Sequence, residues 1–484
     1  MLMPVIHFFL FAAGPHPRRL SPLAHFARGG HSQRDFSITF LAIALLVSMP
    51  RAETPNVYAI RGARIVPVAG APIESGTVVI RRGLIEAVGA NVAAPPDADA
   101  IDGKGLTVYP GLIDLGNTRA AEQPIPETAQ NARTTAELER WKRAQILKPQ
   151  ALAADALKPD DAELTRLAAA GITSVLALPS GDVITGQSAL VNVAARPDEP
   201  QIGSVVEERR GLFVVKTPVA LHVTFPERPR AGGNAYPESL MGVIAFVRQA
   251  FLDAQHYQLE RAATQRGPQW AALNNDAALE AMQPALDRKL PVAFEANASR
   301  EILRALKLAR ELKLDPIVTG ARGAAEVAAD LKAQNIRVVY SLNYPQRSRA
   351  LAPDADESLR TLRERADAPA VPAGLARAGV TFAFESAGLA EPKDFVRNAA
   401  RAVKAGLPAD AAVRALTAGA AAIAGVADRL GTIEPGKIAN LVVTDGDLFD
   451  EKMQVKRVFV NGRAVPLAAA PPAPAGRGRG RGGL

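Results

Sequence analysis

The sequence predicts a large α/β barrel accompanied by an accessory domain. The chain has 484 residues, too many for one small core. In its middle part, apolar segments typical of buried strands alternate with amphipathic helical segments. This alternation favours a parallel sheet covered by helices. Short strand-like segments punctuated by glycine precede it and indicate a separate β-rich region.

The expected elements follow in a regular order. Strands near the N-terminus are expected over 58–68, 76–81 and 84–88. Later buried strands are expected over 171–179, 290–295, 315–319, 337–342 and 380–384. Helices are expected over 164–170, 299–312 and 324–334, with Ser299 as an N-cap. The amphipathic segment 242–257, which contains His256, is expected to be a packing helix.

Both ends of the chain carry segments that we expect to lie outside the folded body. Residues 36–49 are apolar and are followed by Pro50, Arg51 and Ala52, as in a signal peptide cleaved near Ala52. We therefore expect residues 1–55 to be a signal peptide and disordered extension, and the protein to be periplasmic or extracellular. The alternative is a buried or membrane-anchoring helix. The Gly/Arg-rich tail, 467–484, is expected to be disordered.

Composition narrows the chemistry available to the protein. The net charge of +8 comes mainly from arginines in the N-terminal extension and in the tail, so the nearly neutral body argues against nucleic-acid binding. The absence of cysteine excludes disulfides, thiolate metal sites and a cysteine nucleophile. Of six histidines, only His222 and His256 lie beyond the N-terminal extension. This scarcity argues against a metal centre built from several imidazoles.

Two sequence blocks carry a family resemblance. The first is PGLID at 110–114; the second is DRLGTIEPGKIANLVV at 428–443, followed by VFVNGR at 458–463. Both resemble the amidohydrolase superfamily, in its imidazolonepropionase-like branch, although Asn440 replaces the usual Asp. The resemblance implies a TIM-like (β/α)8 barrel over 110–425. It also implies a small β-sandwich built from both chain ends, over 56–109 and 426–466.

The same resemblance identifies the positions at which active relatives hold a catalytic metal. In those relatives PGLID is followed by His-x-His, but this chain has Gly116 and Thr118. A later His position carries Glu295, and another falls in the segment 319–322, which contains no histidine. The metal-binding Asp position carries Ala387 in the simplest register, and a shift of one or two residues would bring Glu385 there instead. The sequence thus predicts a barrel without a metal centre or other cofactor.

Several side chains remain candidates for chemistry at the predicted strand ends. Glu295 and Glu385, with Asp114, could surround a divalent cation such as Mg²⁺ or Ca²⁺, or the two glutamates could serve as general acid and base. The alternative is that they pair with Arg or Lys. The Gly- and hydroxyl-rich segment 179–188 is expected to rim the barrel. Further candidates for a ligand pocket are Asn117, Lys216, His222, Asn297, Asn343 and Ser386. For Lys216 a salt bridge, and for His222 a hydrogen-bonded core position, are the simpler interpretations.

Together these observations predict an exported amidohydrolase-superfamily pseudoenzyme. It would bind a small polar or peptide-like ligand, or support an active paralogous subunit; homo-oligomerisation is also open. No nucleic-acid partner and no stable membrane insertion are expected. The contrasting hypothesis is an active hydrolase of C–N bonds in non-peptide or cyclic amides, working through a carboxylate-based site.

Overall fold

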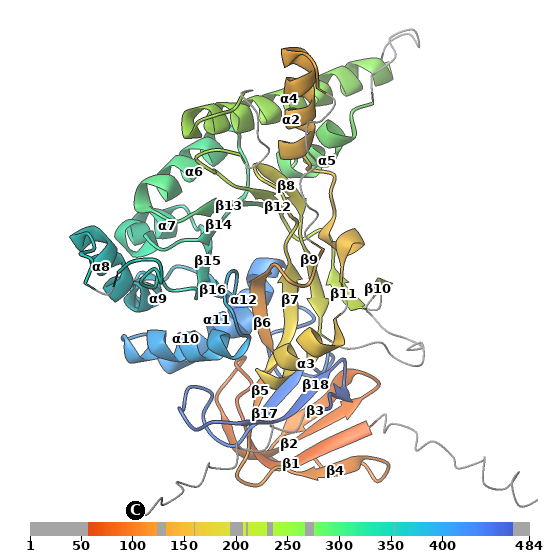
Figure 1. The fold of residues 1–484 in the computed structure, drawn as a ribbon. Helices are drawn as coiled ribbons and strands as arrows, with labels where there is room; N and C mark the ends of the chain where they lie inside the picture. The colour runs from red at the N-terminus through yellow and green to blue at the C-terminus, as the bar shows by residue number, and fades with distance from the viewer. Residues whose placement is uncertain are drawn as a thin grey trace, which may run out of the picture. The chain divides into compact units, whose positions relative to one another are not determined.

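The computed structural model describes residues 57–122, 132–158, 160–193, 207–209, 212–229, 236–266, 275–352 and 354–467. The chain divides into two units, Met1–Thr54 and Pro55–Leu484, and the described elements all belong to the second (Figure 1). The predicted signal peptide, its cleavage site and the Gly/Arg tail lie outside the described residues. Within the described part of the chain, no helix has the length and apolar character needed to cross a membrane.

Strands from both ends of the described chain form one sheet. Its order is β19-β18-β17-β5-β1-β2-β3, with β4 beside β1. The N-terminal strands are β1 (Val57–Ile65), β2 (Ile73–Arg81), β3 (Leu84–Gly89), β4 (Asp99–Asp102) and β5 (Thr107–Pro110). The C-terminal strands are β17 (Leu441–Thr444), β18 (Val455–Val460) and β19 (Arg463–Ala464). The ends meet where Tyr109 of β5 pairs with Val442 of β17. The second layer of a sandwich stays a prediction.

Two further sheets form the centre of the unit. One has the order β10-β11-β9-β7-β6 and the other β16-β15-β14-β13-β12-β8. The first contains β6 (Leu112–Asn117), β7 (Ile172–Ala177), β9 (Ala189–Asn192), β10 (Glu207–Arg209) and β11 (Leu212–Lys216). The second contains β8 (Ile184–Gln187), β12 (Leu221–Val223), β13 (Val292–Ala296), β14 (Pro316–Gly320), β15 (Arg337–Ser341) and β16 (Phe382–Glu385).

The two central sheets are linked at both margins. On one side only Ser188 separates β8 from β9, which belong to different sheets. On the other side β16 lies against β6, where the Ser386 N–H donates to Asp114 Oδ1 at 2.8 Å. The described strands therefore surround a common interior, although the ladders themselves do not form a single closed sheet.

The expectation of a purely parallel sheet is wrong at one place. Strands β12 to β16 are parallel, and so are β6 and β7, but β9 runs antiparallel to β7 and β8 antiparallel to β12. Only residues 178–188 lie between β7 and its neighbour β9, and a parallel neighbour would need a crossover of a dozen or more residues. The predicted rim segment 179–188 consequently contains the buried strand β8, and only its first part remains a loop.

Helices cover the outward faces of the central strands, as the alternating pattern predicted (Figure 1). The longer ones are α2 (Thr135–Ile146), α3 (Asp161–Ala169), α4 (Leu240–Arg266), α5 (Ala277–Leu286), α6 (Ser299–Glu311), α8 (Leu359–Asp367), α10 (Lys393–Lys404) and α11 (Ala409–Leu416). The shorter ones are α7 (Ala328–Ala333), α9 (Val371–Arg377) and α12 (Ala418–Ala424), with 3₁₀ turns η1 (Ala153–Ala156), η2 (Ala324–Val327) and η3 (Ala368–Ala370).

The start of α6 differs in detail from the prediction. Ser299 is the first helical residue, and the N-cap is Ala298. The carboxylate of Glu301 accepts the backbone N–H groups of Asn297 and Ala298 at 2.8 and 2.9 Å. A carboxylate in the first helical turn satisfies otherwise unpaired donors and so replaces the missing hydroxyl cap.

The register of the central strands determines which side chains enter the interior. Ala293, Ile317, Val339 and Ala383 share one buried apolar cluster with residues of α12. Side chains two positions apart point to the same face of a strand. Glu295, Thr319, Ser341 and Glu385 therefore lie on this inner side, one layer closer to the carboxyl ends of β13 to β16. The ladder pairs Glu295 with Thr319 and Ser341 with Glu385.

A buried network of polar side chains joins the terminal sheet to the first central sheet. Asn440 Nδ2 donates to Ser174 Oγ at 3.1 Å and to Asn192 Oδ1 at 3.0 Å. Asn192 Nδ2 in turn donates to Asn461 Oδ1 at 2.6 Å, and the Asn461 N–H donates to Asn440 Oδ1 at 2.8 Å. All four side chains are buried. Because buried polar groups are costly when unpaired, this network fixes one packing of the two sheets.

Candidate ligand-binding site at the carboxyl ends of the strands

A buried carboxylate connects the first and last strands that bear site residues. Asp114 of β6 is fully buried, and its Oδ1 accepts the N–H groups of Ser386 and Gly116 at 2.8 and 3.1 Å. Its Oδ2 accepts the Ser386 hydroxyl at 2.5 Å. Burial raises the pKa of Asp114, while the hydrogen bonds from Ser386 and Gly116 act in the opposite direction. Asp114 and Ser386 thus have a structural function in closing β6 onto β16.

Glu385 lies beside this connection, at the end of β16, and its side chain is buried. Burial raises the pKa of its carboxyl group well above the usual range, and the negative charges of Glu295 and Asp114 raise it further. A hydrogen bond from the Gly320 backbone and the positive charge of Arg322 partly oppose this shift. The combined effect favours a protonated carboxylic acid, which can donate a hydrogen bond as well as accept one.

Glu385 occupies the space next to Gly116. A Cβ atom built on Gly116 would lie 2.7 Å from Glu385 Cβ and 2.8 Å from Glu385 Oε2. Ordinary contacts between carbon atoms are about 3.5–4.0 Å. Position 116 therefore accepts only glycine at this strand separation, and the expected location of the first imidazole ligand is filled by a carboxyl group.

The side chain of Glu295 lines a cavity of about 350 Å³ in front of β13. Unlike Glu385, its side chain is exposed. The walls combine the apolar Phe225, Pro226 and Leu240 and the backbone of Gly181 with polar residues, which are Asp182, Thr224, Asn297, Glu301 and Arg304. The ring of Phe225 stacks on that of Phe294, with centroids 6.1 Å apart. The cavity thus offers an apolar wall, a carboxylate and an arginine to a small polar molecule.

Asn297 has an unsatisfied acceptor at this cavity. Its Oδ1 is buried and has no hydrogen-bond partner among the described residues. A Cβ atom built on Gly320 would lie only 2.6 Å from Asn297 Oδ1. Gly320 also has a positive φ of 77°. A buried unpaired carbonyl is destabilising, so Asn297 is suited to accept a hydrogen bond from a ligand.

The other predicted pocket residues are dispersed. The carboxamide of Asn117 accepts the backbone N–H groups of Arg119 and Ala120, so it shapes the turn after β6. Lys216 Nζ donates to the carbonyl groups of Ala424 and Gly425, so the ammonium binds the C-terminal end of α12. These contacts give both residues structural functions away from Glu295.

His222 lies on the inner side of β12, next to Ala293 in the ladder. Its Nε2 is buried without a partner among the described residues, and burial lowers the pKa of the imidazole to about 4. The ring is therefore neutral near pH 7 and can bind through one donor or one acceptor nitrogen. His256, by contrast, lies on α4 with Nε2 2.9 Å from Glu260.

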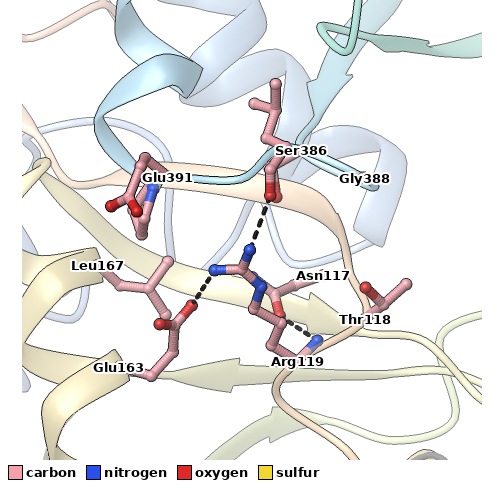
Figure 2. A pocket seen from close by; sticks show the side chains of 10 residues that line it. Asn117, Thr118, Arg119, Glu163, Leu167, Ser386, Gly388 and Glu391 are labelled. Carbon is pink, nitrogen blue, oxygen red and sulfur yellow. Dashed lines mark hydrogen bonds and ion pairs between the residues drawn. The ribbon is translucent and has the colours of Figure 1, made fainter. Parts of the chain in front are cut away.

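Arg119 is a residue that the sequence analysis missed. Its guanidinium donates to the carbonyl groups of Leu389 and Ala390 at 2.9 and 2.7 Å. It also pairs with Glu163 of α3 at 3.2 Å (Figure 2). It thereby fastens the loop after β16 to α3. No local sequence signal marks this role, because the partners are distant in the chain.

The residues at the strand ends do not fit the metal centre that the family resemblance implies. Within the described ranges, no three His, Asp or Glu side chains are arranged to hold a metal ion. Glu385 fills the space beside Gly116, and Thr118 offers only a hydroxyl. Transition metals in hydrolases need nitrogen or carboxylate ligands that leave an open position for water.

The fold is a TIM-like barrel with mixed α/β content, and comparison with known proteins identifies its class. The chain is similar to members of the amidohydrolase superfamily. A model of the amidohydrolase family matches residues 233–465, a stretch that begins after Gly116 and Thr118. An amidohydrolase from Thermotoga maritima MSB8 is similar at 25% identity and a TM-score of 0.67, covering 84% of this chain and 99% of that one.

Two further solved structures are less similar. A prolidase complexed with N-methylphosphonate-L-proline is 21% identical with a TM-score of 0.48, covering 84% of this chain and 99% of the prolidase. A Xaa-Pro dipeptidase with bound methionine is 16% identical, also with a TM-score of 0.48, and is covered to 99%. No protein with a curated description matches the sequence.

Proposed function

We propose that this protein is a member of the amidohydrolase superfamily that binds a small polar or peptide-like ligand at the strand ends without a metal ion. The observation that carries the proposal is the position of Glu385, whose Cβ would be 2.7 Å from a Cβ at residue 116. This contact removes the first ligand position of the family's metal centre. What remains is a polar cavity with an acidic donor nearby.

The cavity in front of β13 supplies groups for recognising such a ligand. Asn297 Oδ1 can accept an amide N–H, Arg304 can bind a carboxylate, and Phe225 can pack against an apolar side chain. Glu295 can bind an ammonium group. A compound with an amide, a charged end and a modest apolar group matches this set, which is why we favour a peptide-like ligand.

A second candidate function is hydrolysis of C–N bonds in non-peptide or cyclic amides by paired carboxyl groups. The raised pKa of Glu385, next to the charge of Glu295, favours it. Glu295 as a general base would take a proton from water while the water oxygen attacks the amide carbon. Glu385 as a general acid would protonate the departing nitrogen.

The cellular setting belongs to the same proposal. Export to the periplasm or the exterior is supported by the apolar run at 36–49, followed by Pro50-Arg51-Ala52. A non-catalytic barrel could also act as a subunit beside an active paralogue or in a homo-oligomer. Purification from the native compartment, followed by mass spectrometry of co-eluting chains, tests both ideas.

The decisive experiment measures binding with metal excluded. Dipeptides and N-acetylated amino acids are titrated into the purified protein in the presence of EDTA, and metal content is measured separately. We expect saturable binding of at least one compound, weakened at least tenfold by E295Q and unchanged by the surface control E260Q. Loss of all binding in EDTA, restored by a stoichiometric divalent ion, would contradict the proposal.

Turnover distinguishes the two candidate functions. The amide of E385Q imitates a protonated carboxylic acid in shape but cannot transfer a proton. If the protein only binds, E385Q retains affinity and no compound is hydrolysed. If the second candidate is correct, the wild type hydrolyses the bound amide in EDTA, and both E295Q and E385Q abolish hydrolysis.

A further inference from the structure

A second cavity with a different character lies at the carboxyl ends of β14, β15 and β16. It measures about 640 Å³ and is bordered by the loops after these strands and by one face of α10. The α10 residues that line it are Asp394, Arg397, Asn398 and Arg401. Their spacing of three or four residues places them on the same side of the helix.

The cavity is strongly basic. Arg322, Arg397 and Arg401 line it, and Asp394 is the single carboxylate among the described lining residues. Asp394 pairs with Arg397. Within the described part of the chain, neither Arg322 nor Arg401 has a carboxylate at ion-pair distance. Two guanidinium groups are therefore available to an anion in a concave site, where electrostatic attraction is focused.

Arg401 is held in a defined position. Its guanidinium carbon lies 4.8 Å from the centre of the Tyr344 ring, and its Nη1 donates to Asn398 Oδ1 at 3.3 Å. The Tyr344 hydroxyl donates to the Asn398 carbonyl at 3.0 Å, and Asn398 Nδ2 donates to the Leu342 carbonyl at 2.9 Å. A guanidinium fixed by stacking loses little conformational freedom when it binds an oxyanion.

The surrounding polar groups also favour an anion. Two carbonyl groups of the lining loop, those of Leu389 and Ala390, accept hydrogen bonds from Arg119. Because these two carbonyl oxygens already accept hydrogen bonds from Arg119, they repel an anionic ligand less than free carbonyl oxygens would. The carboxamides of Asn343 and Gln346, which also line the cavity, add donors.

We infer that this cavity is a binding site for a small organic anion that carries a phosphate or a carboxylate group. The planar, forked guanidinium group matches both oxyanions, and the cavity has room for an attached organic part. The inference is independent of the proposed function, because Glu295 and Glu385 do not line this cavity.

Calorimetric titration of the full chain with inorganic phosphate, and separately with succinate, tests the inference at low ionic strength. We expect saturable binding of at least one anion and at least a tenfold loss of affinity in R322Q and in R401Q, about 1.4 kcal/mol each. The control R457Q removes an exposed arginine of β18 and should bind as the wild type does. Affinity should also fall at an ionic strength of about 0.15 M.

The two probes identify the source of the anion. Binding of phosphate alone indicates a phosphorylated ligand, and binding of succinate alone indicates a carboxylate. If neither anion binds saturably, or if R322Q and R401Q bind like the wild type, the inference is wrong. Circular dichroism of each variant verifies folding, which is expected to be intact because Arg322 and Arg401 are exposed. Failure here leaves dipeptide binding and its dependence on Glu295 unaffected, so the two proposals can be judged separately.

Discussion

Replacing Gly116 with alanine tests the close contact between β6 and β16. The new Cβ would be 2.7 Å from Glu385 Cβ, and that atom is fixed by the backbone of β16. Reaching an ordinary separation requires β6 and β16 to move apart by about 1 Å. The same movement would disturb the hydrogen bonds between Asp114 and Ser386.

The expected cost follows from these distances. Overpacking a buried site costs about 1–3 kcal/mol. A Gly-to-Ala change also stabilises by about 0.4–1 kcal/mol through the unfolded chain where the backbone allows it, and Gly116 has no positive φ. We therefore expect G116A to lower the free energy of unfolding by about 1–2 kcal/mol. Urea unfolding, with the slope unchanged, measures this value.

Matched variants separate steric conflict from other effects. Gly70 has nothing within 4 Å of its hypothetical Cβ, so G70A should not destabilise. Adding G116A to E385G should cost nothing, because no Cβ remains at residue 385. Adding G116A to E385A should keep most of the cost, because the Cβ atoms still collide. If G116A is as neutral as G70A, or if E385A relieves it fully, the close approach of β6 and β16 is wrong.

Three further predictions address the remaining parts of the structure. Because burial raises the pKa of Glu385, its contribution to stability is complete below the unfolded value near 4.5 and is lost as pH rises through the folded pKa. E385Q should remove this decline and so raise the free energy of unfolding above the folded pKa, as urea titrations across pH would measure; the same decline in wild type and E385Q would contradict it. N440A should cost about 2–4 kcal/mol in the same assay, because Ser174 and Asn192 each lose one of their hydrogen bonds and the Asn461 N–H loses its acceptor; an effect below about 1 kcal/mol would contradict the network. R119A should accelerate amide hydrogen exchange in residues 386–391 with little change in global stability, and unchanged exchange there would refute its fastening role.

Local sequence patterns were sufficient for much of the fold. The apolar runs at 172–177, 292–296, 337–341 and 382–385 are strands whose apolar residues are buried on both faces, as the continuous patterns predicted. The antiparallel direction of β8 and β9 was missed, although the short connection after β7 contains the necessary information. The buried charge of Lys142, which is 2% exposed on α2, carries no local sequence signal either.

The sequence likewise predicts one part of the candidate site, and the folded structure determines the rest. The absence of histidine near residues 114–118 and 319–322 is evident from the sequence, and so are carboxylates at 295 and 385. The distances between these residues in the folded protein are not evident from the sequence. The hydrogen bond between Asp114 and Ser386 joins residues 272 positions apart, and it brings Glu385 against Gly116. Likewise, the basic cavity draws its arginines from the loop after β14 and from α10.

The sequence by itself determined the family resemblance, the alternation of strands and helices over much of the chain, and the residue types available for chemistry, because these depend on neighbours along the chain. Only the tertiary structure decided which of those residues meet. The separation of β6 from β16 places a carboxyl group where an imidazole would stand, and the packing of α10 against the strand ends gathers guanidinium groups with few carboxylates. Both outcomes depend on how distant segments pack, and packing distances are not encoded in any single segment.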